Sequence, residues 1–132
     1  MSGYGMMGVD WEERINYDRL RKERLAKVRA AMEKLNIDVL LLCRRESDRY
    51  VTGYRSLWMP VANVSLPDCI LPRDGDPIQF EDVYATETIE KTPWLRPENV
   101  RYHVTPNELK AAVGRHSNGV IGVDVWSPEA YE

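Results

Sequence analysis

The sequence has only two cysteines and two histidines among its 132 residues. Cys43 falls inside an apolar run and Cys69 comes shortly after a proline, which is not the number or spacing of a secreted disulfide framework. Free buried cysteine behaves as a small hydrophobic residue. We therefore expect the protein to work in the reducing environment of the cytoplasm.

The chain also lacks any uncharged apolar run of about 18 residues, the length that a membrane helix needs. Its first eight residues contain no basic segment followed by an apolar one, so a secretory signal is not indicated. The net charge of -3 provides no general attraction to a phosphate backbone. These features disfavour export, membrane insertion and nucleic-acid binding.

What remains is the composition of one ordinary globular domain, with 43% hydrophobic and 30% charged residues. Apolar residues recur at helical spacing between positions 20 and 35, and lysines and arginines occupy the other side. This pattern predicts an amphipathic surface helix that Asp18 caps and Asn36 ends.

The run from Asp38 to Cys43 is apolar without alternation, which is typical of a strand covered on both faces. The turn-rich segment 72–77 separates two extended segments, 68–71 and 78–80, and so indicates a hairpin. Hairpin strands are antiparallel, and we therefore expect an α/β fold with a mixed β-sheet flanked by helices.

Further elements are expected along the second half of the chain. They are an extended segment at 61–65, a short helix at 85–91, a half-buried strand at 100–104, a helix that begins at Thr105 and an apolar strand at 120–125. Thr105 and Glu108 form a capping box with a proline between them. A second start signal of this kind opens at Ser127 and stops at Glu132, so we expect sequence beyond it.

The segment from Cys43 to Arg49 has the C-x5-R spacing of cysteine phosphatases, in which backbone amides and an arginine hold phosphate. Here the loop contains Glu46 and Asp48, whose charges repel an anion, and it lacks glycines. We interpret Cys43 as a buried thiol at a strand end rather than a nucleophile.

Metal and nucleic-acid sites find little support. His103 and His116 are thirteen residues apart and match no metal motif, and the acidic residues from 74 to 82 lack calcium-loop spacing. Six positive residues and one negative residue lie between Arg19 and Arg29. On an amphipathic helix these are its solvated side, and no aromatic residues are interleaved for base stacking. We therefore predict no metal and no nucleic acid in this chain.

Trp11, Trp94 and Trp126 are interpreted as packing or edge residues. Trp58 differs, because the segment 54–60 combines aromatic residues with the fixed charge of Arg55. Such a composition is typical of a loop that binds another molecule or another chain. The alternative is that residues 57–59 fill the core of this domain.

Residues 47–54, which read Ser-Asp-Arg-Tyr-Val-Thr-Gly-Tyr, resemble the N-x-x-Y-x-T-G-F/Y element of the creatinase, prolidase and aminopeptidase P family. Tyr50, Thr52 and Gly53 match the structural positions of that element. Ser47 stands where asparagine is usual, and Tyr54-Arg55 departs from the commoner phenylalanine-led sequence. The order of the elements from about residue 18 to 124, closing with Ile-Gly-Val-Asp, is also similar to the N-terminal domain of this family.

The resemblance implies a mixed sheet with flanking helices, similar to ribonuclease H in fold, over residues 17–126. Residues 1–16 are polar and glycine-rich, and we expect them to be a flexible lead. The resemblance implies that residues 127–132 begin a linker helix to a missing C-terminal pita-bread domain. That domain would bind the divalent metal, expected to be manganese, cobalt or zinc. This chain by itself would carry no catalytic residue.

In the family this domain builds a homodimer and projects a loop toward a neighbouring active site. By position, Tyr54, Arg55 and Trp58 resemble that loop, and an aromatic ring with a guanidinium suits a polar substrate pocket. The resemblance implies the accessory domain of an Xaa-Pro dipeptidase-like hydrolase acting on a small peptide or other small molecule. The alternatives are a creatinase-type amidinohydrolase, a dimethylsulfoniopropionate lyase or a self-sufficient α/β interaction module.

Overall fold

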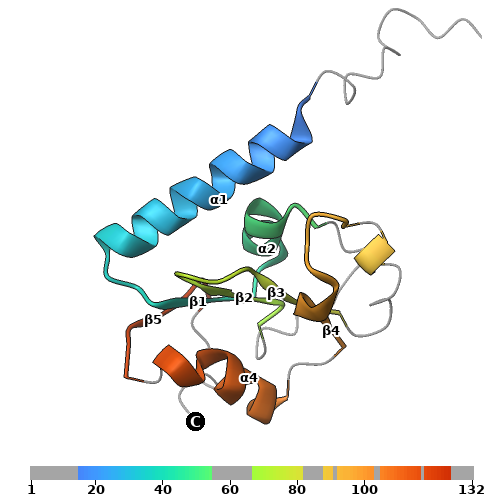
Figure 1. Ribbon diagram of the computed structural model, residues 1–132. Coiled ribbons are helices and arrows are strands. Elements are labelled where there is room, and N and C mark those ends of the chain that lie inside the picture. Colours follow the sequence, from blue (N-terminus) through green and yellow to red (C-terminus); the bar gives the residue numbers. More distant parts are fainter. Residues whose placement is uncertain are drawn as a thin grey trace, which may run out of the picture.

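In the computed structural model, a five-stranded sheet separates two helices on one face from a third helix on the other (Figure 1). The residues that the structure describes are 15–54, 67–81, 88–90, 92–102, 105–116 and 118–125. Within them the elements are α1 (Tyr17–Lys34), β1 (Val39–Leu42), α2 (Arg45–Thr52), β2 (Cys69–Pro72), β3 (Ile78–Phe80), the 3-10 helix η3 (Pro97–Asn99), β4 (Val100–Arg101), α4 (Pro106–Val113), the 3-10 helix η4 (Gly114–His116) and β5 (Ile121–Val123). No described helix has both the length and the apolar character that a membrane span requires.

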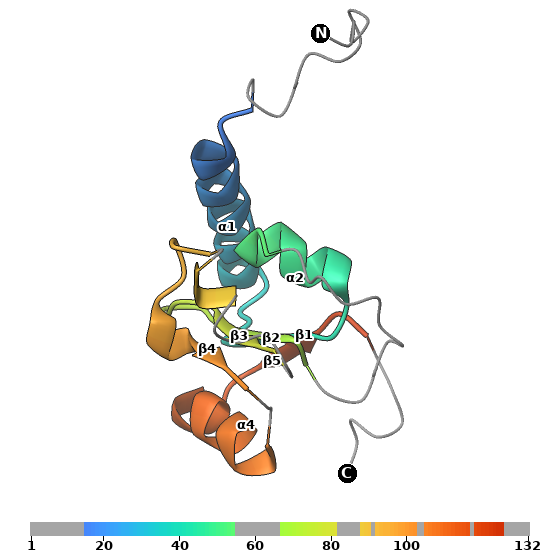
Figure 2. The same cartoon turned by 90° about the vertical axis from the view of Figure 1, so that its right-hand side faces the viewer.

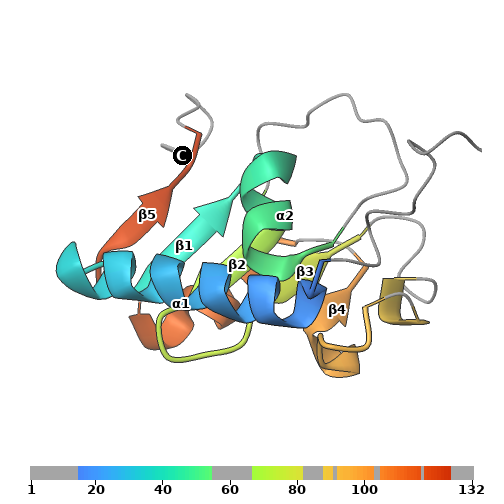
Figure 3. The same ribbon diagram turned by 90° about the horizontal axis from the view of Figure 1, so that it is seen from above.

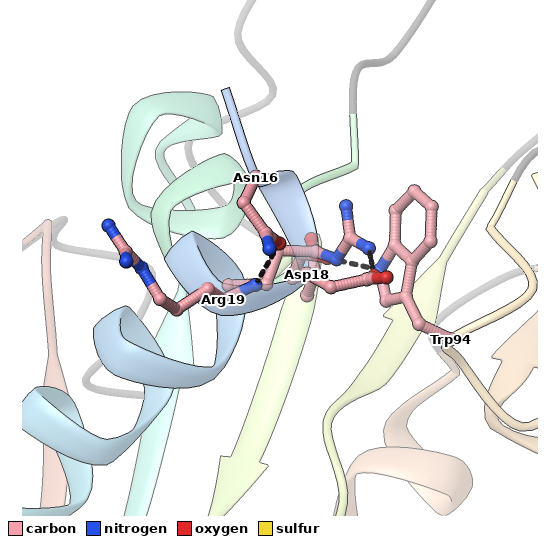
Figure 4. Close-up of polar contacts among 6 residues, drawn as sticks. Asn16, Asp18, Arg19 and Trp94 are labelled. Atoms are coloured by element: carbon pink, nitrogen blue, oxygen red, sulfur yellow. Dashed lines mark hydrogen bonds and ion pairs between the residues drawn. The ribbon is translucent and has the colours of Figure 1, made fainter. Parts of the chain in front are cut away.

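The first helix, α1, begins at Tyr17, and its N-cap is Asn16. The Asn16 side chain accepts a hydrogen bond from the Arg19 N–H at 2.9 Å (Figure 4), so the prediction that Asp18 caps this helix is wrong. Asparagine and aspartate cap helices about equally well. With Asn16 as the cap, the helix is longer and includes the partly buried Tyr17. Asp18 then lies in the first turn, where its negative charge interacts favourably with the helix dipole.

The end of α1 at Asn36 is confirmed. Asn36 has a φ of 54°, the left-handed conformation that asparagine tolerates after a helix. The N–H of Ile37 donates to the carbonyl of Met32 at 2.8 Å, and that of Asn36 donates to Glu33 at 3.1 Å. This pair of hydrogen bonds reverses the chain and directs it into β1.

The sheet is mixed, as predicted, and its strands lie in the order β4-β3-β2-β1-β5. β1 is antiparallel to β2 and parallel to β5, while β3 is antiparallel to β2 and parallel to β4. The predicted hairpin is thus the β2-β3 pair, with Ile70 opposite Ile78. Arg29 of α1 donates to the carbonyl of Gly75 at 2.5 Å and so fastens the helix to the hairpin turn.

Both faces of the central strands are covered, as the unbroken apolar run predicts. Helices α1 and α2 lie on one face and α4 on the other (Figures 2 and 3). The cluster under α1 and α2 consists of Met32, Leu42, Val51, Cys69 and Leu71. The cluster facing α4 consists of Val39, Ile70, Ile78 and Phe80, packed against Leu109, Ala112 and Val113. Alternation along β1 and β2 supplies both clusters from the same strands.

The capping box of α4 is confirmed, because Thr105 accepts from the N–H of Glu108 at 3.2 Å and Glu108 accepts from the N–H of Thr105 at 3.0 Å. Residues 88–90 are helical within the helix expected at 85–91. The strand expected at 100–104 is described as β4, and its last two residues lie outside the described chain. The predicted strand at 61–65, residues 1–14 of the predicted lead and the predicted linker start lie outside it as well.

Candidate functional site

The Tyr-x-Thr-Gly element forms the last turn of α2 and the residue that ends it. Gly53 has a φ of 73° and its N–H donates to the carbonyl of Arg49 at 2.9 Å. A side chain at this position would be strained by the left-handed backbone, and its Cβ would lie 2.6 Å from Cδ of Arg21. Glycine is therefore favoured here both by the left-handed conformation and by the close approach of the Arg21 side chain of α1.

A clamp of two side chains holds this turn from outside. The indole N–H of Trp94 donates to the carbonyl of Thr52 at 2.6 Å, and the Arg21 guanidinium lies 3.7 Å from the centre of the Trp94 ring. Arg21 is also ion-paired with Asp18, and Figure 4 shows Trp94 beside Asp18 at the start of α1. The clamp connects α1, α2 and the segment after residue 92 at a single point.

Tyr54, the first residue after the turn, is buried rather than exposed, with 7% of its surface accessible. Its hydroxyl donates to Oε2 of Glu81 at 2.6 Å and accepts from Oγ1 of Thr88 at 3.0 Å. Its backbone N–H donates to Oγ1 of Thr52 at 3.1 Å. Tyr54 therefore fixes the point from which the chain continues toward residues 55–66.

Among the other sequence-predicted site residues that the structure describes, Thr52 and Gly53 adjoin Tyr54, and Tyr50 lies apart from it. Tyr50 lies on the outer side of α2, 40% exposed, where the guanidinium of Arg24 lies 5.1 Å from its ring centre. Arg55 and Trp58 lie outside the described residues.

Beneath the turn lies a buried polar network that the sequence interpretation missed. Asp48 is 5% exposed, and its Oδ2 accepts from Nε2 of Gln79 at 2.8 Å. The Thr52 hydroxyl is 3.0 Å from both Oδ1 and the backbone oxygen of Asp48. The i, i+3, i+4 spacing of Asp48, Val51 and Thr52 was the available signal, because it places all three on the inward side of α2.

Burial raises the pKa of Asp48 to about 7, opposed by the hydrogen bonds from Gln79 and Thr52 and aided by the nearby carboxylates of Asp68 and Glu81. The geometry suits both protonation states. When Asp48 is ionised, the Thr52 hydroxyl donates to its Oδ1. When Asp48 is protonated, Oδ1 donates to Thr52, whose own proton turns to the Asp48 backbone oxygen.

The loop after β1 holds a carboxylate of the protein itself where a phosphatase would hold phosphate. The N–H of Cys43 donates to Oδ1 of Asp124 at 2.7 Å and that of Arg44 donates to Oδ2 at 3.0 Å. Burial, with the charges of Asp124 and Asp68, raises the pKa of Cys43 to about 11. A thiol with such a pKa and an occupied amide site do not make a phosphatase nucleophile.

A scan against protein-family models matches residues 24–131 to the creatinase/prolidase N-terminal domain. This match covers most of the chain, from the middle of α1 past β5. The chain belongs to the creatinase/prolidase N-terminal domain family. No curated protein matches the sequence significantly. The α/β architecture with a mixed five-stranded sheet is consistent with this family's fold, and the resemblance stated from residues 47–54 is confirmed.

A metal ion held by this creatinase/prolidase N-terminal domain would need several converging His, Cys, Asp or Glu side chains. Among the residues that the structure describes, no three His, Cys, Asp or Glu side chains gather as a metal ligand set. Within the acidic stretch, Asp76 pairs with Arg96 at 2.9 Å and Glu81 accepts from Tyr54. His103 and Asp82 lie outside the described residues. The described part of the domain thus holds the Tyr-x-Thr-Gly turn and Tyr54 in fixed positions.

Proposed function

We propose that this domain is the non-catalytic N-terminal part of a metal-dependent Xaa-Pro dipeptidase-like hydrolase, in which it contributes to a homodimer and caps an active site. The observation that carries the proposal is the family match over residues 24–131, which spans the Tyr-x-Thr-Gly turn. Catalysis would then belong to a separate domain that binds manganese, cobalt or zinc, and the substrate would be a small peptide.

The fixed position of Tyr54 supports the capping role. A loop that closes an active site needs a rigid base, because catalysis is sensitive to displacements of about 1 Å. Tyr54 supplies that base through Glu81 and Thr88, and Arg55 follows it directly in the sequence. We infer that Arg55 and Trp58 contact the substrate, with the guanidinium binding a carboxylate and the indole packing on an apolar side chain.

A cytoplasmic location is part of the same proposal. Cys43 and Cys69 are free thiols, and burial raises the pKa of both. Two unpaired cysteines are typical of proteins in a compartment that keeps thiols reduced.

The test starts from the native gene product. An immunoblot of source cells with an antibody against this domain should give a band well above the 15.3 kDa of these 132 residues. The purified product, loaded with manganese, should hydrolyse Xaa-Pro dipeptides. Turnover of creatine or dimethylsulfoniopropionate instead would favour the corresponding alternative enzyme, and a band at 15.3 kDa would favour a self-sufficient interaction module.

Variants of the full-length product test the capping loop. Arg55→Ala and Trp58→Ala should each lower kcat/KM for the dipeptide by at least tenfold while leaving the metal content unchanged. Lys27→Ala, on the exposed side of α1, is the matched control and should leave kcat/KM within twofold. Equal activity in all three variants would refute the loop's role without touching the family assignment.

A further inference from the structure

A cavity of about 290 Å³ adjoins the outer side of the clamp, and nothing in the proposed function uses it. It lies between the first turns of α1, the end of α2, the hairpin turn and the segment after residue 92. Its apolar walls are formed by Leu25, Val51, Pro77, Trp94 and Leu95. Val51 and Leu95 are buried core residues, so the inner wall of the cavity consists of side chains that the core holds in place.

Charged side chains line the rest of the same cavity. Arg21 pairs with Asp18, and Nε of Arg96 lies 2.9 Å from Oδ2 of Asp76. Lys22 is the fifth charged residue, and no described carboxylate pairs with it. The lining therefore carries one positive charge in excess beside an apolar wall.

We propose that this cavity binds a small molecule that has an apolar body and a single carboxylate. The body packs on Trp94 and Leu25, where transfer from water is favourable. The carboxylate reaches Lys22 and the Arg96 nitrogens that Asp76 leaves available, which neutralises the excess charge. The volume lies at the lower end of the range for ligand pockets, about 300–1,000 Å³. It therefore fits one aromatic ring with a short chain rather than a nucleotide.

Binding at this site would act on the Tyr-x-Thr-Gly turn. Val51 and Thr52 line the cavity, and Trp94 donates its indole N–H to the Thr52 carbonyl at 2.6 Å. A ligand packed on Trp94 holds the indole in that hydrogen bond. Because Gly53 directly follows Thr52 in the sequence, the ligand also stabilises the turn at Gly53. The indole proton of Trp94 is therefore a reporter at the site itself.

The experiment is a titration of the ¹⁵N-labelled 132-residue protein, followed by NMR at the indole resonance of Trp94, which is assigned through a Trp94→Phe variant. The probes are 3-phenylpropanoate, 3-phenylpropan-1-ol and 3-phenylpropylamine, which share the apolar body and differ in charge. We expect a saturable shift with the carboxylate, weaker binding of the alcohol by about threefold or more, and the weakest binding with the amine.

Two variants separate this site from general surface binding. Lys22→Gln and Arg96→Gln should each weaken 3-phenylpropanoate by about threefold, because each removes one exposed cationic contact. Lys27→Gln, on the same helix but outside the cavity, should leave the affinity unchanged. The proposal fails if no saturable shift appears, if the three probes bind equally, or if the control weakens binding as much as the two site variants.

Discussion

Replacement of Asp48 by asparagine should remove most of the pH dependence that this residue gives to stability. Asp48 is the buried acid whose pKa the fold raises from 3.8 to about 7. Between these two values the folded protein binds a proton that the unfolded chain has released. The contribution of Asp48 to the free energy of unfolding therefore falls as pH rises through this range and levels off above about pH 8.

The size of the effect follows from the two pKa values. Their difference corresponds to about 4 kcal/mol over the whole range, and to about 2 kcal/mol between pH ~5.5 and pH ~8. Asparagine imitates the protonated acid, because its oxygen can accept from Gln79 and its amide can donate to the Thr52 hydroxyl. The Asp48→Asn variant should thus gain about 2 kcal/mol relative to the wild type from pH ~5.5 to pH ~8.

The assay is urea unfolding at these two pH values, followed by circular dichroism. Asp74→Asn serves as the matched control, because it removes an exposed carboxylate from the hairpin turn and should change the pH dependence little. If the wild type and Asp48→Asn lose stability in parallel as the pH rises, Asp48 is not the titrating group and the reasoning is refuted.

Three other predictions concern Gly53, Asp124 and Cys43. Gly53→Ala should lower the free energy of unfolding by about 1–2 kcal/mol because of the left-handed backbone, with a further loss from the contact with Arg21. Urea unfolding measures this, and an unchanged urea midpoint would contradict that geometry. Asp124→Ala should cost about 2–3 kcal/mol, since it leaves two backbone N–H groups without their acceptor, and Asp124→Asn should cost less because it keeps one oxygen. The Cys43 thiol should react with iodoacetamide about 100-fold more slowly than a free cysteine at pH ~8, because burial raises its pKa to about 11. Mass spectrometry of the alkylated peptide measures this rate, and a rate equal to that of free cysteine would exclude the raised pKa.

Much of the fold could be predicted because its signals are local. The amphipathic spacing of α1, the unbroken apolar run of β1 and the capping box at Thr105 each depend on a few neighbouring residues. The prediction of Asp18 as the cap of α1 was wrong because Asn16, which caps the helix in the structure, satisfies the same backbone donors equally well.

The site was harder to predict because its contacts are distant in sequence. Gln79 is 31 residues from Asp48, and Trp94 is 42 residues from Thr52. From the sequence, Asp48 counted as one of two loop charges, whereas both residues lie on α2, where Glu46 is exposed and Asp48 is buried on the inward side. Tyr54 was expected at a substrate loop, but its side chain is buried inside the domain. Whether residues 55 and 58 contact a substrate stays a prediction.

The strand order also constrains how the chain folds during synthesis. β1 lies between β2 and β5, yet β5 follows it by about 80 residues, and Asp124 lies 81 residues from Cys43. Until that late segment leaves the ribosome, one edge of β1 is an unpaired row of N–H and C=O groups next to apolar side chains. Parallel pairing over such a separation is slow. The nascent domain therefore presents an aggregation-prone edge for most of its translation, and this is the stage at which a chaperone would shield it.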